Sequence, residues 1–128
     1  MQIFRALRIA AITAGLAVAA PALAHAVLVS ASPAASSTAS NVKVVRLNFN
    51  EAFMPKLSGL EIMMTGMPGM MHHGAMKMTG VAVTASADKK ALIATLARPL
   101  PAGSYDVNWH TVGSDTHRVT GKVSFTVK

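Results

Sequence analysis

The densest group of potential metal ligands lies between residues 63 and 78, in the stretch MMTGMPGMMHHGAMKM. It holds seven of the nine methionines of the chain, namely Met63, Met64, Met67, Met70, Met71, Met76 and Met78, together with His72 and His73. Thioethers are soft, polarizable ligands that suit Cu(I) or Ag(I). Because three glycines and a proline interrupt the stretch, a regular helix is excluded. The pattern predicts a loop that can fold several donors around one ion.

Two other interpretations of this stretch stay open. The methionines could pack against the rest of the fold, or they could form an adaptable surface that docks another protein. A surface loop rarely carries a row of large apolar side chains without a purpose, so soft-metal binding is favoured. The chain has no cysteine. In an oxidising compartment thioethers have the advantage over thiols, because they do not form disulfides.

A second, harder set of donors is spread along the chain. Asp115 and His117 lie two residues apart in GSDTH, and His25 becomes the first residue if the chain is cut after Ala24. A terminal amine and an imidazole on one residue can close a chelate ring on Cu(II), and the distant Asp-x-His pair can add nitrogen and oxygen donors. Nickel, zinc and silver stay open as alternative ions. His110 is expected on the solvent face of its strand and is not predicted as a ligand.

The first 24 residues have the three-part layout of a secretory signal peptide. Arg5 and Arg8 precede an apolar run over residues 9–20, and Pro21 leads into the small-residue triplet that ends at Ala24. The apolar run is shorter than the roughly 20 residues that a membrane-spanning helix needs. We therefore predict that residues 1–24 are a cleaved signal peptide. Residues 25–128 then form a single exported domain that is not embedded in a membrane.

Composition argues against nucleic-acid binding. The formal charge of the chain is +7, and Arg5 and Arg8 account for two of these charges, so +5 remains after cleavage. The basic residues are scattered singly, and one Trp and one Tyr provide no aromatic platform among them. A solvated, mildly basic surface is the expected result.

Hydrophobic alternation predicts strands. The segments VKVVRLNFN, GSYDVNWHT and GKVSFTVK alternate apolar and polar residues with period two, as half-buried strands do. Shorter candidates are HAVLVSA, GLEIMM, VAVTAS and ALIATL, which are separated by turn-prone segments such as SPAASSTASN and RPLPAG. About seven short strands without a long amphipathic helix predict one all-β domain, an antiparallel sandwich or barrel.

Five motifs together resemble the periplasmic copper-binding proteins of the CopC/PcoC family over nearly the whole exported domain. They are HAVLVSASPA, LNFNEAF, MTGMPGM, GSYDVNWHTVGSDTHRVTG and VSFTVK. The resemblance implies a Greek-key β-sandwich, described as cupredoxin-like or Ig-like, with separate copper sites at opposite ends. It implies Cu(II) ligation by His25, Asp115 and His117, with Glu51 as a further carboxylate, and a Cu(I) site made of Met64, Met67, Met70 and His72. Where the family has its last methionine this chain has Ala75, so Met76 is expected to replace it.

These inferences predict a periplasmic copper carrier of copper resistance or homeostasis. It would hold Cu(II) at the terminal-histidine site and Cu(I) at the methionine site, and it would pass copper to other proteins. The resemblance implies a multicopper oxidase or an inner-membrane copper transporter as the partner. An oxidative copper enzyme that uses the terminal histidine, and a metal-free exported docking module, are the alternatives. The enzyme is disfavoured because carboxylates crowd the coordination sphere and the chain has little aromatic surface for gripping a polymer.

Overall fold

The computed structural model describes residue 15, residues 25–69 and residues 74–128. In this part of the chain the elements are β1 (Leu28–Ser32), β2 (Thr38–Ala39), β3 (Val44–Phe49), the 3-10 helix η1 (Pro55–Leu57), β4 (Gly59–Gly66), β5 (Met76–Lys77), β6 (Val81–Ala85), β7 (Ala91–Leu96), β8 (Gly103–Val112) and β9 (Arg118–Val127). The predicted signal peptide lies outside the described residues, except for Gly15. No helix in the described ranges is long and apolar enough to cross a membrane.

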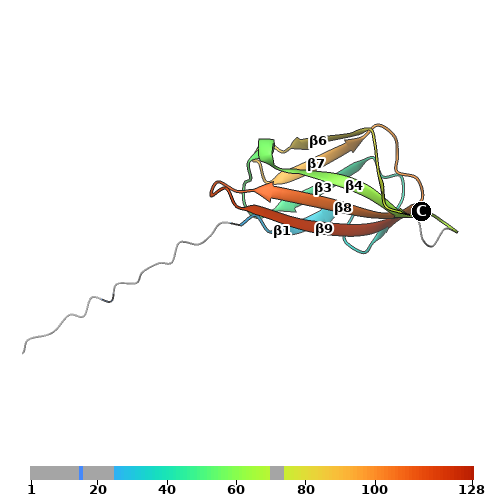
Figure 1. The fold of residues 1–128 in the computed structure, drawn as a ribbon, viewed down its shortest axis with the longest axis horizontal. Helices are drawn as coiled ribbons and strands as arrows, with labels where there is room; N and C mark the ends of the chain where they lie inside the picture. Colours follow the sequence, from blue (N-terminus) through green and yellow to red (C-terminus); the bar gives the residue numbers. More distant parts are fainter. Residues whose placement is uncertain (1–14, 16–24, 70–73) are drawn as a thin grey trace, which may run out of the picture.

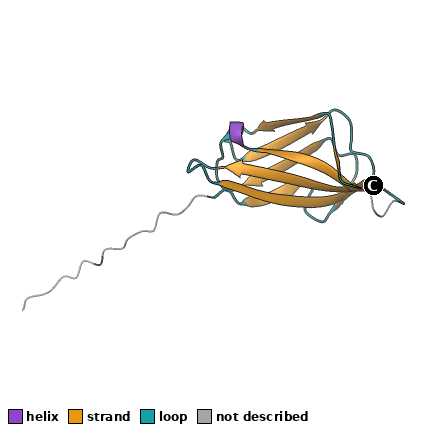
Figure 2. Ribbon diagram, in the orientation of Figure 1, coloured by secondary structure: helices purple, strands orange, loops and turns teal. Residues whose placement is uncertain are grey.

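The strands form two sheets that pack face to face (Figures 1 and 2). One sheet has the order β1-β3-β7-β6 and the other the order β2-β9-β8-β4-β5. All pairs are antiparallel except β2 with β9. The all-β sandwich predicted from the sequence is confirmed. The seven expected strands correspond to β1, β3, β4, β6, β7, β8 and β9. The described residues add β2 and β5, which are only two residues long and too short to show alternation.

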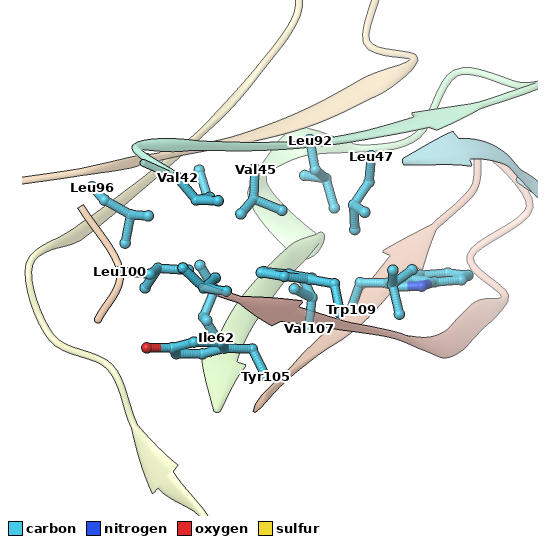
Figure 3. Close-up of a cluster of buried hydrophobic side chains, with 14 of the residues drawn as sticks. Val42, Val45, Leu47, Ile62, Leu92, Leu96, Leu100, Tyr105, Val107 and Trp109 are labelled. Carbon is cyan, nitrogen blue, oxygen red and sulfur yellow. The ribbon is translucent and has the colours of Figure 1, made fainter. Parts of the chain in front are cut away.

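The core lies between the sheets and is filled by the side chains that the alternation pointed inward (Figure 3). Strands β3, β8 and β9 contribute Val45, Leu47, Phe49, Tyr105, Val107, Trp109, Val123, Phe125 and Val127, all of them buried. Aromatic rings also pack in the core, where the rings of Phe49 and Trp109 meet edge to face at a centroid distance of 4.9 Å. The packed sheets give the connecting turns at the two ends of the sandwich a rigid base.

The methionine-rich stretch was predicted as a loop, and this prediction was partly wrong. Met63 and Met64 belong to β4, and Met76 belongs to β5, which pairs antiparallel with β4. The end of β4 therefore pairs with β5 as a β-hairpin, and residues 70–73 of the stretch lie outside the described residues. The interrupting glycines and proline exclude a helix, but they do not prevent the flanking residues from joining an existing sheet edge.

Candidate metal centres

The turn between β8 and β9 positions the Asp115 and His117 side chains at one end of the sandwich. The backbone N–H of Gly113 donates to the carbonyl of His117 at 3.2 Å, and that of Thr116 donates to Gly113 at 2.9 Å. Thr116 has a φ of 66°, a left-handed conformation that reverses the chain before β9 begins. The tight turn directs both candidate side chains outward from a rigid two-stranded ladder.

Asp115 and His117 are bound to each other. One carboxylate oxygen of Asp115 lies 2.8 Å from Nδ1 of His117, and the other accepts the backbone N–H of His117 at 3.1 Å. These hydrogen bonds, the side-chain bond first, lower the pKa of Asp115 below its ordinary value of 3.8. A carboxylate that holds Nδ1 orients the imidazole and leaves its Nε2 to face a ligand.

His25 lies beside this turn because the segment that follows it is anchored. The amide oxygen of the Asn50 side chain accepts the backbone N–H of Val27 at 2.7 Å, and the backbone N–H of Asn50 donates to the Val27 carbonyl at 3.0 Å. Ala26 is buried in the core. As a result the His25 and His117 rings lie with their centroids 5.8 Å apart and their planes at 69°. Two imidazoles 92 positions apart in the sequence are thus neighbours.

Glu51 follows the Asn50 anchor directly and is exposed. The backbone thus brings Glu51 to the segment that also positions Val27, two residues after His25. Among residues 25–69 and 74–128, however, no three His, Asp, Glu or Cys side chains converge closely enough to hold a metal ion. The structure brings together His25, Asp115 and His117 in pairs, and it does not bring Glu51 into contact with them.

The methionine end carries a different set of side chains. Met64 and Met76 are directly opposite each other in the β4–β5 pair, so their side chains lie on the same face. Met64 is 4% exposed and belongs to the core, whereas Met76 is 50% exposed and Met67 is 40% exposed. Met70 and His72, the other two residues predicted at this site, lie outside the described residues. Figure 1 shows this hairpin at the right, at the opposite end of the sandwich from the β8–β9 turn.

Sequence reasoning missed two residues near the histidine end. Asn50 anchors the N-terminal segment, as described above. Trp109 lines a shallow hollow of about 500 Å³ together with His25, Val27, Leu28 and Val119. Its Nε1 is buried and has no hydrogen-bond partner among the described residues. The one sequence feature that could have indicated the position of Trp109 is Gly121. It lies opposite Trp109, and its missing side chain makes room for the indole ring.

The family model of the CopC domain matches residues 28–128. The chain belongs to the CopC family. Copper resistance protein C of Pseudomonas syringae pv. tomato is 44% identical over 115 residues, which cover 90% of each chain. Copper resistance protein C of Escherichia coli is 43% identical over 121 residues, which cover 93% of this chain and 95% of the relative. The sequence resemblance to the CopC/PcoC family is confirmed.

A solved structure supports the same placement within the CopC family. The crystal structure of PcoC, a methionine-rich copper resistance protein from Escherichia coli, superposes on this chain with a TM-score of 0.75 and 41% sequence identity. The match covers 82% of this chain and 100% of that structure. The two sheets described above are therefore the fold of this family, and both ends of the sandwich lie within the matched domain.

Proposed function

We propose that this chain is a periplasmic copper-binding protein of copper resistance. The support is its membership of the CopC family, together with relatives named for copper resistance. The observation that carries the proposal is the closeness of His25 and His117, whose ring centroids are 5.8 Å apart. Imidazoles gathered at an exposed end of a rigid fold suit a borderline ion such as Cu(II).

At the histidine end, cleavage after Ala24 would give His25 a free amine beside its imidazole. The amine, the two imidazoles and the carboxylate of Asp115 then make a nitrogen-rich donor set for Cu(II). Asp115 already holds Nδ1 of His117 at 2.8 Å, so it orients this ring and offsets part of the charge of the ion. Glu51 is the further carboxylate that we propose for this site, and it would have to approach the turn when the ion binds.

At the other end, we propose a Cu(I) site built on the β4–β5 hairpin. Met67 and Met76 are exposed there, and Met64 lies opposite Met76. Met70 and His72, between the two strands, complete the proposed set. Thioethers favour Cu(I) over Cu(II), so the two ends would select different oxidation states of the same metal.

Two exposed sites fit a protein that carries copper to partners better than they fit an enzyme. His25 and His117 at one end, and Met67 and Met76 at the other, are exposed, so a partner could approach an ion there and exchange ligands. We propose that a multicopper oxidase or an inner-membrane copper transporter receives the copper. Oxygen consumption by the copper-loaded protein, measured with an oxygen electrode, should not exceed that of free copper at the same concentration. Turnover above that background would favour the oxidative enzyme instead.

The test is a pair of titrations on the naturally processed protein. Cu(II) titration, and Cu(I) titration under reducing conditions, should each show one site, filled independently of the other. A variant that keeps one additional alanine ahead of His25 should lose Cu(II) affinity, because the amine and the imidazole then no longer belong to one residue. Met67→Leu is the matched control and should weaken Cu(I) alone. Unchanged Cu(II) affinity in the extended variant would refute the proposed histidine site.

A further inference from the structure

Four adjacent polar side chains stand on the outer face of the five-stranded sheet, away from the core. Asn108 and His110 come from β8, and Arg118 and Thr120 come from β9. In the antiparallel ladder His110 is opposite Thr120, and Arg118 is opposite Val112. All four side chains line one open hollow of about 630 Å³. The proposed copper site lies at the end of the same ladder, but the hollow itself faces sideways from the sheet.

These four side chains have polar groups that are free to bind a ligand. Within residues 25–69 and 74–128, none of their polar side-chain atoms has a hydrogen bond or an ion pair. The next pair along the same face behaves differently, since Asp106 accepts a hydrogen bond from the hydroxyl of Ser124 at 2.6 Å and lies 3.8 Å from Nζ of Lys122. The hollow therefore offers a group of donors that the protein itself does not use.

The charges around the hollow favour an anion. Arg118, Lys77 and Lys122 line it, and Glu61 is the carboxylate among the lining residues. Lys77 pairs with Glu61 and Lys122 pairs with Asp106, each at 3.8 Å, so Arg118 is the cation at the hollow that has no ion-pair partner among the described residues. Arg118 contributes a planar group of five donors that matches two oxygens of a carboxylate or a phosphate.

The position of the His110 ring depends on a glycine. Gly59 of β4 is opposite His110, and a Cβ on residue 59 would lie 3.3 Å from Cε1 of that ring. Because residue 59 has no side chain, the His110 ring can lie close to the β4 backbone, where it lines the hollow.

We propose that this hollow binds a small oxyanion, a carboxylate or a phosphate. Arg118 pairs with two of its oxygens, and His110, Thr120 and Asn108 donate hydrogen bonds to the remaining oxygens. The site is separate from the proposed copper sites and does not rest on copper binding. A small anion fits better than a broad partner surface, because the uncommitted donors are confined to four neighbouring positions of the ladder.

The test uses the metal-free, naturally processed protein at constant ionic strength. Sodium phosphate and sodium succinate are titrated separately, and backbone amide shifts are followed by NMR. Saturable shifts are expected at residues 108, 110, 118 and 120, and the anion that saturates at lower concentration identifies the preferred class. Arg118→Gln should weaken binding about tenfold, the size of effect expected when one charge-assisted pair is lost. Arg98→Gln, an exposed arginine outside the hollow, is the matched control and should bind as the unchanged protein does.

His110→Gln provides a second variant that keeps the sheet face polar, and it should weaken binding less than Arg118→Gln while leaving the melting temperature unchanged. Shifts that never saturate with either anion would overturn the proposal. Equal weakening by Arg118→Gln and Arg98→Gln would overturn it as well, because that result would show a diffuse attraction to a basic protein. Copper titrations are not involved, so failure here leaves the copper proposal standing.

Discussion

Replacing Gly121 with alanine is expected to destabilise the fold, because the space at this position is already taken by Trp109. Gly121 is opposite Trp109 in the β8–β9 ladder. A Cβ on residue 121 would overlap Cζ2 of the indole and would lie 2.5 Å from Cε2 and 2.9 Å from Nε1. Carbon atoms in van der Waals contact are about 3.5–4.0 Å apart. The ring therefore has to move, although Phe49 packs against it at a centroid distance of 4.9 Å.

The expected cost of Gly121→Ala is about 1–3 kcal/mol, the usual range for overpacking a well-filled core. In a domain of this size each kcal/mol lowers the melting temperature by about 4–8 °C. Thermal unfolding followed by circular dichroism measures this change. The chain has one Trp, so the emission spectrum also reports the displaced ring without interference. We expect a shifted emission maximum in the folded variant, because the same ring lines the hollow beside His25.

Gly66→Ala is the matched control for Gly121→Ala. It also lies in a strand of the five-stranded sheet, but the nearest atoms to its added Cβ belong to Ser104 at 3.8 Å, which is an ordinary contact. This substitution should be neutral or stabilise by about 0.5–1 kcal/mol, since alanine loses less backbone entropy on folding than glycine does. If Gly121→Ala melts at or above the temperature of Gly66→Ala, the packing argument for Trp109 is wrong.

Three further predictions follow from single residues. Burial raises the pKa of Tyr105 above its ordinary value of 10.0, so the neutral phenol stabilises the fold below pH 10 and this contribution is lost as the pH rises further. Tyr105→Phe should therefore reduce the fall of the melting temperature above pH 10. An unchanged slope of melting temperature against pH would contradict this. Met64→Leu and Met67→Leu should both weaken Cu(I) binding in competition titrations, but only the buried Met64 substitution should lower the melting temperature, by up to about 1.5 kcal/mol of stability. Unchanged Cu(I) affinity in Met64→Leu would show that Met64 is a core residue and not a ligand. Asp115→Asn should lower Cu(II) affinity and leave Cu(I) affinity unchanged, because the amide loses the charge that orients His117, and equal Cu(II) affinity in titrations would argue against this role.

The core could be predicted from the sequence because each long strand carries its own signal. The alternation of Val45, Leu47 and Phe49 with polar residues predicts which face of the strand is buried, and all three side chains are buried in the structure. The short strands carry no such signal. Met76 and Lys77 form β5 only because β4 offers an unpaired edge, and this depends on contacts that are distant from any local pattern.

The candidate histidine site could be predicted only in part, for the same reason. Asp115 and His117 are close in sequence, so their spacing predicts that they share a turn. The closeness of His25 depends on the two hydrogen bonds between Val27 and Asn50, which are 23 positions apart. Nothing in the residues 25–27 alone indicates that partner. Glu51 is exposed directly after this anchor, and its assignment to the copper site stays a prediction that rests on the motif.

The length of β8 is a reason to expect the two proposed copper sites to act independently. The strand runs for ten residues, from Gly103 beside the methionine hairpin to Val112 at the start of the β8–β9 turn. At about 3.4 Å per residue the two ends are roughly 30 Å apart. Two charges at that separation, with solvent around both, interact weakly because the Debye length at physiological salt is about 8 Å. Filling one proposed site should therefore leave the affinity of the other unchanged, and any coupling found in a double titration would have to pass through the packed sheet rather than through the field of the ions.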